Sequence, residues 1–441
     1  ALSDQDVRLR LIAQASTAGD DVIVGFWGDD VIHGGAGDDV LRGLGGGDTY
    51  LWGRESGSDI VDDLYGTVYE DQPDKISFLP NVVREDVSFR KMGNDLIISI
   101  AGEPNTLTIS NHFYLSNYRI ESFVFANGVV VTDAEVDVLA ILGQATGGDD
   151  VIVGTAGADL IEGKAGNDIL RGGDGDDRYV FNPGFGSDVI RESVNNQFTT
   201  ERDMIEFGGD LASDKAILNR IGDDLIISFV GALDQVRVEG QFTHGASYPS
   251  WTDVEVVRFS DGVVWTDDDI RNQLLSQSIT EANDTVTGYF TDDIIDGGKG
   301  DDLLIGRGGA DVYVYERGDG RDVIRDSATV YEVGDDTIAF GQTIHPEDVA
   351  FLKEGDNLRL LINGDDGELL IEKQFNVLYN GIEYFRFANG TVFGAGEVAA
   401  RAIAAMSTMN NDVITGTSAK DIFDGLGGQD DLSGRGGADV Y

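Results

Sequence analysis

The sequence predicts an all-β fold in which parallel β-roll blocks alternate with small hairpin sheets and a short capping helix. A nine-residue phrase recurs along the chain, with glycine at its first and fourth positions, aspartate at its sixth and a large apolar residue at its eighth. A longer period is nested around it, because the equivalent aspartates Asp21, Asp150, Asp284 and Asp412 are 129, 134 and 128 residues apart. Nested periods of this kind indicate a stacked repeat architecture.

The nine-residue phrase is clearest at residues 154–177. Its first six positions are rich in glycine and suit a tight loop with unusual backbone angles. Its last three positions predict a short strand with one inward side chain, such as Ile161 or Leu170. Two phrases complete one turn of a coil, so the strands are expected to stack into two parallel sheets with Ile, Leu, Val and Tyr between them.

Four blocks of the phrase divide the chain into modules. We predict a terminal helix at 1–15, then modules at 16–143, 144–278 and 279–406, and a truncated β-roll at 407–441. Within the three modules the β-rolls are expected at 16–62, 145–190 and 279–324. Since residues 1–15 read as the tail of another module and the last copy breaks off at Tyr441, we expect a fragment of a longer tandem array.

The segments between the blocks match one another more loosely. Alternating apolar residues around a polar turn predict hairpins at 87–100, 216–229 and 349–362. A further strand is expected to end at Phe113, Phe242 or Phe375, and the last strand at Gly128, Gly262 or Gly390. Helices are predicted at 132–142, 266–275 and 394–406, with Thr132 and Thr266 as N-caps. The first helix is expected to begin at Ser3 or Asp4 and to place Val7, Leu11 and Ile12 on one face.

The charge of the chain excludes several classes of partner. Eighty acidic and 31 basic residues give a net charge of −49, which opposes binding to nucleic acid or to anionic lipid. Such a charge repels itself in a compact state and therefore indicates a bound cation. Cysteine is absent, and no apolar run reaches the length of about 20 residues that a transmembrane helix needs. Neither an H-E-x-x-H nor a G-x-S-x-G motif occurs, so we expect no enzyme.

The spacing of the aspartates predicts calcium sites. Loops eighteen residues apart should lie on the same edge of the coil, about 4.8 Å apart. Two such loops surround one gap with carboxylates and backbone carbonyls, which suits the 6–8 oxygen ligands of calcium better than the stricter octahedron of magnesium. The predicted pairs are Asp21 with Asp39, Asp30 with Asp48, Asp150 with Asp168, Asp159 with Asp177, Asp284 with Asp302, Asp293 with Asp311, Asp412 with Asp430, and Asp421 with Asp439. Degenerate repeats extend the blocks through Asp59, Asp188 and Asp322.

The phrase resembles the nonapeptide of the repeats-in-toxin family of secreted bacterial proteins, the haemolysin-type calcium-binding repeats. GGAGDDVLR at 34–42 and GGDGDDRYV at 172–180 match it at every defining position, whereas the fourth-position glycine is missing at Ala282, Thr291, Asn410 and Ala419. The segments between the blocks look like the haemolysin-type calcium-binding related domain. The resemblance implies Ca²⁺ as cofactor, export by type I secretion, and an extracellular or cell-surface location.

The sequence favours a structural role, as a stiff spacer, surface-layer, adhesin or filament segment that contacts other copies of itself. Two alternatives stay open. Tyr114, Tyr118, Tyr248, Trp251 and Tyr379 are expected in loops before the last strand and could bind a cell-surface glycan, as related modules accompany mannuronan epimerases. The chain could also be the receptor-binding region of a pore-forming toxin.

Overall fold

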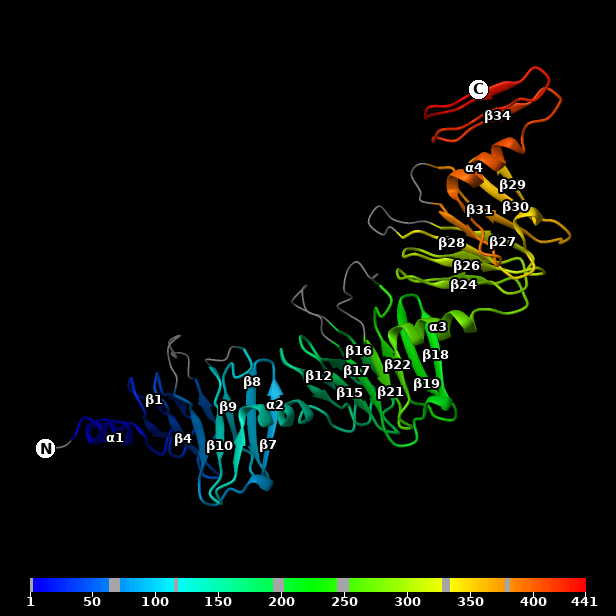
Figure 1. Cartoon of the computed structure of the whole chain (residues 1–441). Helices are drawn as coiled ribbons and strands as arrows, with labels where there is room; N and C mark the ends of the chain where they lie inside the picture. The colour runs from blue at the N-terminus through cyan, green and yellow to red at the C-terminus, as the bar shows by residue number, and fades with distance from the viewer. Residues whose placement is uncertain are drawn as a thin grey trace. The chain divides into compact units, whose positions relative to one another are not determined.

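The computed structural model describes residues 3–62, 72–114, 118–192, 202–243, 254–326, 334–376 and 381–441 (Figure 1). The chain divides into two compact units. One comprises Ala1–Ile217, Ile227–Glu239 and Val254–Val264, and the other Leu218–Ile226, Gly240–Asp253 and Trp265–Tyr441. Tyr248, Trp251 and Tyr379, expected in a glycan-binding surface, lie outside the described residues. Within the described residues, no helix is long and apolar enough to cross a membrane.

The same order of elements occurs three times along the chain. The first set is α1 (Asp4–Ala15), β1 (Val22–Val24), β2 (Val31–His33), β3 (Val40–Arg42), β4 (Thr49–Trp52), β5 (Asp59–Val61), β6 (Lys75–Phe78), β7 (Val87–Met92), β8 (Asp95–Ile100), β9 (Thr106–Ile109), β10 (Ser122–Val124), β11 (Val130–Thr132) and α2 (Asp133–Leu142).

The second set repeats these strands and ends again in a helix. It consists of β12 (Val151–Val153), β13 (Leu160–Ile161), β14 (Ile169–Arg171), β15 (Arg178–Phe181), β16 (Ser187–Ile190), β17 (Met204–Phe207), β18 (Ala216–Ile221), β19 (Asp224–Phe229), β20 (Gln235–Val238), β21 (Val256–Arg258), β22 (Val264–Thr266) and α3 (Asp267–Gln277).

The third set has the same order, and two further strands follow it. Its elements are β23 (Thr285–Thr287), β24 (Ile294–Asp296), β25 (Leu303–Ile305), β26 (Val312–Tyr315), β27 (Arg321–Ile324), β28 (Thr337–Phe340), β29 (Val349–Glu354), β30 (Asn357–Ile362), β31 (Glu368–Ile371), β32 (Tyr384–Arg386), β33 (Val392–Gly394) and α4 (Ala395–Ala404), and then β34 (Val413–Thr415) and β35 (Asp431–Ser433).

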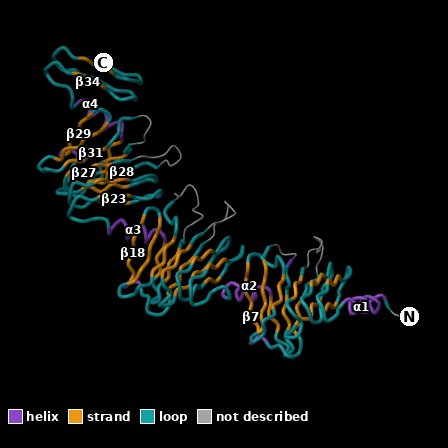
Figure 2. The backbone as a smooth tube through the Cα atoms, turned by 180° about the vertical axis from the view of Figure 1, so that it is seen from behind, coloured by secondary structure: helices purple, strands orange, loops and turns teal. Residues whose placement is uncertain are grey.

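Each set forms a six-stranded and a five-stranded sheet, and this confirms the all-β fold class with parallel rolls (Figure 2). The first six-stranded sheet has the order β1-β3-β5-β9-β8-β7, and its partner β11-β10-β6-β4-β2. Roll strands pair in parallel with an offset of eighteen residues, as in Val22↔Val40 and Val31↔Thr49. The hairpin β7–β8 then joins through β9, which pairs in parallel with β5, so the roll and the accessory strands share one sheet.

The apolar eighth position of the phrase builds the interior. The middle residues of the three-residue strands formed by the nonapeptides of the first roll, Ile23, Ile32 and Leu41, are buried. The same core continues through the accessory strands to Phe89 and Phe123. Because burial of one such side chain contributes about 1.5–3 kcal/mol, this shared core stabilises the first roll together with its accessory sheet.

The predicted helices form, with caps of the predicted kind. Ser3, Thr132 and Thr266 are N-caps whose hydroxyls accept the N–H of the third helical residue, while Gly394 makes no side-chain cap. The first helix forms over Asp4–Ala15, but of the apolar residues expected on one face only Ile12 is buried, and Val7 and Leu11 are 43% and 50% exposed. That helix packs against the short strands β1 and β2, and its Arg8 lies over the ring of Phe26 in the loop between them.

The predicted ends of two strands are also wrong in all three modules. The strands expected to end at Phe113, Phe242 and Phe375 end at Ile109, Val238 and Ile371, and turns follow them. Those expected to end at Gly128, Gly262 and Gly390 end at Val124, Arg258 and Arg386. The chain reverses at these glycines, which have φ of +85° to +90°, and a second short strand pairs antiparallel with the first.

Candidate calcium sites

The loop aspartates form columns along the two edges of each roll. On the first edge, the N–H of Asp21 donates to Oδ1 of Asp39 at 2.8 Å, and the N–H of Asp39 donates to Oδ1 of Asp59 at 3.0 Å. On the second edge, the N–H of Asp30 donates to Oδ1 of Asp48 at 2.8 Å. The structure therefore brings each predicted pair together through a hydrogen bond from backbone to carboxylate.

The other predicted pairs show the same contact. It joins Asp150 to Asp168, Asp159 to Asp177, Asp284 to Asp302, Asp293 to Asp311, Asp412 to Asp430 and Asp421 to Asp439, and it extends from Asp168 to Asp188 and from Asp302 to Asp322. The assignment of these aspartates as calcium ligands stays a prediction, because the geometry shows their proximity and not the ion.

The second-edge columns continue beyond the nonapeptides into the accessory strands. The N–H of Asp48 donates to Asp74 at 2.6 Å, and the N–H of Asp74 donates to Glu121 at 2.7 Å. Asp203 and Glu255, and Asp336 and Glu383, occupy the corresponding places. The sequence analysis missed these residues as site members. Their signal is the recurrence of aspartate before each I-x-F strand and of glutamate near the start of each last strand.

The second carboxylate oxygen explains the glycine at the first position of the phrase. Oδ2 of Asp168 lies over Gly163, and Oδ2 of Asp311 lies over Gly306. A Cβ at either glycine would come well inside the 3.0 Å that real Cβ atoms essentially never enter. Among the described residues, these oxygens are buried and have no hydrogen-bond partner, as are Oδ2 of Asp39, Asp59, Asp188 and Asp302. Buried carboxylate oxygens without donors are costly and fit a bound cation.

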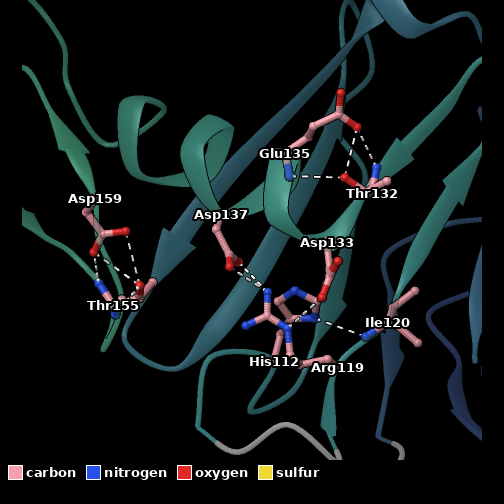
Figure 3. Close-up of polar contacts among 10 residues, drawn as sticks. His112, Arg119, Ile120, Thr132, Asp133, Glu135, Asp137, Thr155 and Asp159 are labelled. Atoms are coloured by element: carbon pink, nitrogen blue, oxygen red, sulfur yellow. Dashed lines mark hydrogen bonds and ion pairs between the residues drawn. The ribbon is translucent and has the colours of Figure 1, made fainter. Parts of the chain in front are cut away.

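In the outermost loops of a block, residues of the same loop donate hydrogen bonds to the loop's aspartate. In the second block, Thr155 donates its N–H and its hydroxyl to Asp159 (Figure 3), and Thr146 donates both to Asp150. In the inner loops the second position has a positive φ instead, +69° at Lys164 and +79° at Arg307. Inner carboxylates such as Asp168 and Asp302 thus lack, among the described residues, the donor that the outer ones have, which makes their layers the better cation sites.

A basic side chain of the preceding hairpin lies near the first aspartate on the second edge of a block. Lys91, only 8% exposed, packs over the ring of Phe113 at 5.6 Å and interacts electrostatically with Asp159. Arg220 interacts electrostatically with Asp293 in the same way, and Lys353 with Asp421. These cations come from one position of the hairpins, where the sequence reads RKMGND, NRIGDD and LKEGDN. Each partly neutralises a carboxylate at the end of a column, where no further layer follows.

Burial raises the pKa of carboxyl groups deep in the columns. Loss of hydration is the main cause, and neighbouring carboxylates add to it, whereas the backbone donor of the preceding aspartate opposes it. The pKa reaches about 7 for Asp59, Asp188 and Asp322 and about 8 for Asp311. These groups bind protons more tightly in the folded chain than in the unfolded chain, where the pKa is about 3.9.

The raised pKa values predict a pH dependence with opposite signs for stability and calcium binding. Without calcium, the free energy of unfolding should fall as the pH rises from about 4 to about 8, because the folded state loses its bound protons. Calcium affinity should rise over the same range, because ions replace those protons. Far-UV circular dichroism of the calcium-free chain at pH 5 and at pH 8, with calcium titrations at both pH values, checks this. A calcium-free chain with more β signal at pH 8 than at pH 5 would contradict it.

Two families match the chain in alternation. The RTX calcium-binding nonapeptide repeat (4 copies) matches residues 16–41, 144–179, 279–313 and 408–441. The haemolysin-type calcium binding protein related domain matches residues 95–135, 224–269 and 357–396. Together they cover more than half of the 441 residues. This chain is an RTX repeat protein. The family resemblance and Ca²⁺ as the ion of the RTX repeats are thereby confirmed.

The other comparisons add a remote structural similarity. A search of the curated proteins finds no match to this RTX repeat protein. Among solved structures, it is similar to the crystal structure of the extracellular lipase LipA from Serratia marcescens, with 20% identity and a TM-score of 0.17. The match covers 54% of this chain and 38% of the lipase chain, so the RTX repeat protein spans about two fifths of that chain's length.

The residues present fit calcium as the ion of the RTX repeats. They offer carboxylate and carbonyl oxygens, which calcium prefers, and the sequence has no cysteine thiolate, which zinc would favour. The inner loops would hold the ion between layers, where it would neutralise two stacked carboxylates. The chain's own residues set the geometry, since the first-position glycines admit the carboxylates and the column hydrogen bonds fix the layer spacing.

Proposed function

We propose that this RTX repeat protein is a calcium-folded structural segment of a secreted or cell-surface bacterial protein, exported by type I secretion and folded by calcium outside the cell. It has no catalytic role and serves as a stiff spacer, surface-layer, adhesin or filament segment. The observation that carries the proposal is the continuity of the carboxylate columns, from Asp30 through Asp48 and Asp74 to Glu121. Ions along such a column would stiffen the roll and the accessory sheet as one body.

Mechanical stretching tests this role directly. The chain is held by its two ends in an optical trap, in millimolar calcium and then in excess chelator. We expect discrete unfolding events in calcium and smooth polymer-like extension in chelator, because the columns lose the ions that hold their layers. Magnesium at the same concentration is the control and should behave like chelator. Identical force curves in calcium and chelator would contradict a calcium-dependent spacer.

Glycan binding is a second candidate function. Tyr114 is 60% exposed, and its ring centroid lies 6.3 Å from that of Tyr118. Two neighbouring aromatic rings at a surface are a common platform for sugar rings. Binding to a glycan array that is lost in Tyr114→Ala but retained in Tyr384→Ala, which changes another exposed tyrosine, would favour this candidate. No binding by the calcium-loaded chain would exclude it.

A further inference from the structure

A cluster of three buried carboxylates lies where the second roll joins its accessory strands. Oxygens of Asp177, Glu192 and Asp203 all lie within 4.8 Å of one another, and the residues are 1%, 6% and 7% exposed. The N–H of Asp177 donates to Asp203 at 2.9 Å. Glu192 follows β16 and accepts the N–H groups of Gly172 and Gly173, both at 3.2 Å. Backbone contacts thus hold all three side chains on one spot.

The spacing of these oxygens suits a calcium ion. Ligands at about 2.3–2.6 Å from one ion are at most about 4.6–5.2 Å apart, and the cluster falls inside that limit. Three buried carboxylates without a cation would repel one another in a medium that screens little. Loop carbonyls and water would supply the remaining oxygens, as is usual for calcium.

The third roll places Asp311, Asp326 and Asp336 at the corresponding positions, where they are 1%, 6% and 3% exposed, although the mutual approach within 4.8 Å is found only for the second-roll group among the described residues. The N–H of Asp311 donates to Asp336 at 2.8 Å, and a side-chain hydrogen bond joins Asp326 to Asp336. Oδ2 of Asp311 is buried and has no hydrogen-bond partner among the described residues. It lies against Gly306 beside the hydroxyl of Tyr313. That hydroxyl interacts electrostatically with all three carboxylates. A buried carboxylate oxygen without a donor among the described residues therefore lies beside a hydroxyl that interacts electrostatically with all three carboxylates.

Most members of these clusters lie outside both matched families. The nonapeptide matches end at residues 179 and 313, and the related-domain matches begin at 224 and 357. Glu192, Asp203, Asp326 and Asp336 fall between them. In the first module the equivalent of Glu192 is Asp63, which lies outside the described residues.

We propose that Asp177, Glu192 and Asp203 form a calcium site that joins the roll to its accessory sheet, and that Asp311, Asp326 and Asp336 form its counterpart. The site is additional to the eighteen-residue pairs, because Glu192 and Asp326 belong to no nonapeptide. Its ion would link three segments that are apart in the sequence. They are the fourth nonapeptide of the roll, the end of the degenerate repeat and the first accessory strand. The proposal shares with the proposed function only the identity of the ion.

The number of bound ions tests the proposal. The full 441-residue chain and the double variant Glu192→Gln/Asp326→Asn are dialysed to equilibrium against calcium, and bound calcium per chain is measured. We expect the variant to bind two ions fewer and to keep its far-UV circular dichroism. The control variant, Glu55→Gln/Asp366→Asn, makes the same chemical changes at exposed positions and should lose none. An unchanged ion count in a folded Glu192→Gln/Asp326→Asn variant would overturn the proposal.

A second measurement decides the matter if the double variant does not fold. Anomalous diffraction from crystals of the calcium-loaded wild-type chain should show a calcium peak among Asp177, Glu192 and Asp203. Peaks restricted to the eighteen-residue pairs would overturn this inference and leave the proposed function intact. A wild-type chain that binds no calcium at all would instead overturn the proposed function.

Discussion

Removal of calcium is expected to unfold the rolls and abolish most of the β signal in far-UV circular dichroism. The inner carboxylates, such as Asp168 and Asp302, are buried without hydrogen-bond donors for Oδ2 among the described residues. The net charge of −49 adds repulsion between layers, and eight ions at the eighteen-residue pairs would carry +16 against it. Each site adds about 2.7 kcal/mol when calcium is at about 100 times its dissociation constant, so two sites in one roll approach the whole stability of a typical domain.

A chelator titration followed by circular dichroism measures this loss. Calcium added back should restore the signal, and magnesium at the same concentration should not. Signal that persists in full in excess chelator would show that the apolar core alone suffices.

Gly320→Ala is expected to destabilise the third roll far more than Gly318→Ala. Both glycines have positive φ, +113° and +92°, so an alanine at either costs about 1–2 kcal/mol in backbone strain. Only at Gly320 would the Cβ also run into the backbone carbonyl of Gly300 in the layer below, whereas nothing lies within 4 Å at Gly318. Overpacking of this kind adds about 1–3 kcal/mol.

The clash caused by an alanine at position 320 should also disturb the residues that contact Gly320. Gly300 and Gly320 form a parallel bridge between layers, and the carbonyl of Gly320 accepts the hydroxyl of Tyr315 at 2.9 Å. Urea unfolding of both variants in saturating calcium gives the comparison. Equal losses of stability in the two variants would show that the layers separate to accommodate the methyl group and are not held in register.

The roll could be predicted from sequence because its contacts are local and periodic. An offset of eighteen residues sets strand pairing and aspartate contacts at once, and the structure has the predicted proximity in all eight pairs. The division into modules and the calcium ligands themselves stay predictions.

The accessory contacts were harder to predict because they join segments far apart in sequence. Asp74 and Glu121 are 47 residues apart, and no short period relates them. Lys91 interacts electrostatically with Asp159 in the next block, and the amino-acid composition does not indicate this interaction. Asp95 accepts the N–H of Asn111 at 2.7 Å, because β9 ends at Ile109 and the turn after it folds back onto the hairpin.

The central claim is that stacked loop carboxylates hold calcium between layers of the roll. Long-wavelength anomalous diffraction from crystals grown in calcium tests it most directly. The account predicts calcium peaks between loops eighteen residues apart, at about 2.3–2.6 Å from oxygens of pairs such as Asp150 with Asp168. A folded chain whose two roll edges show water but no calcium peak would contradict it.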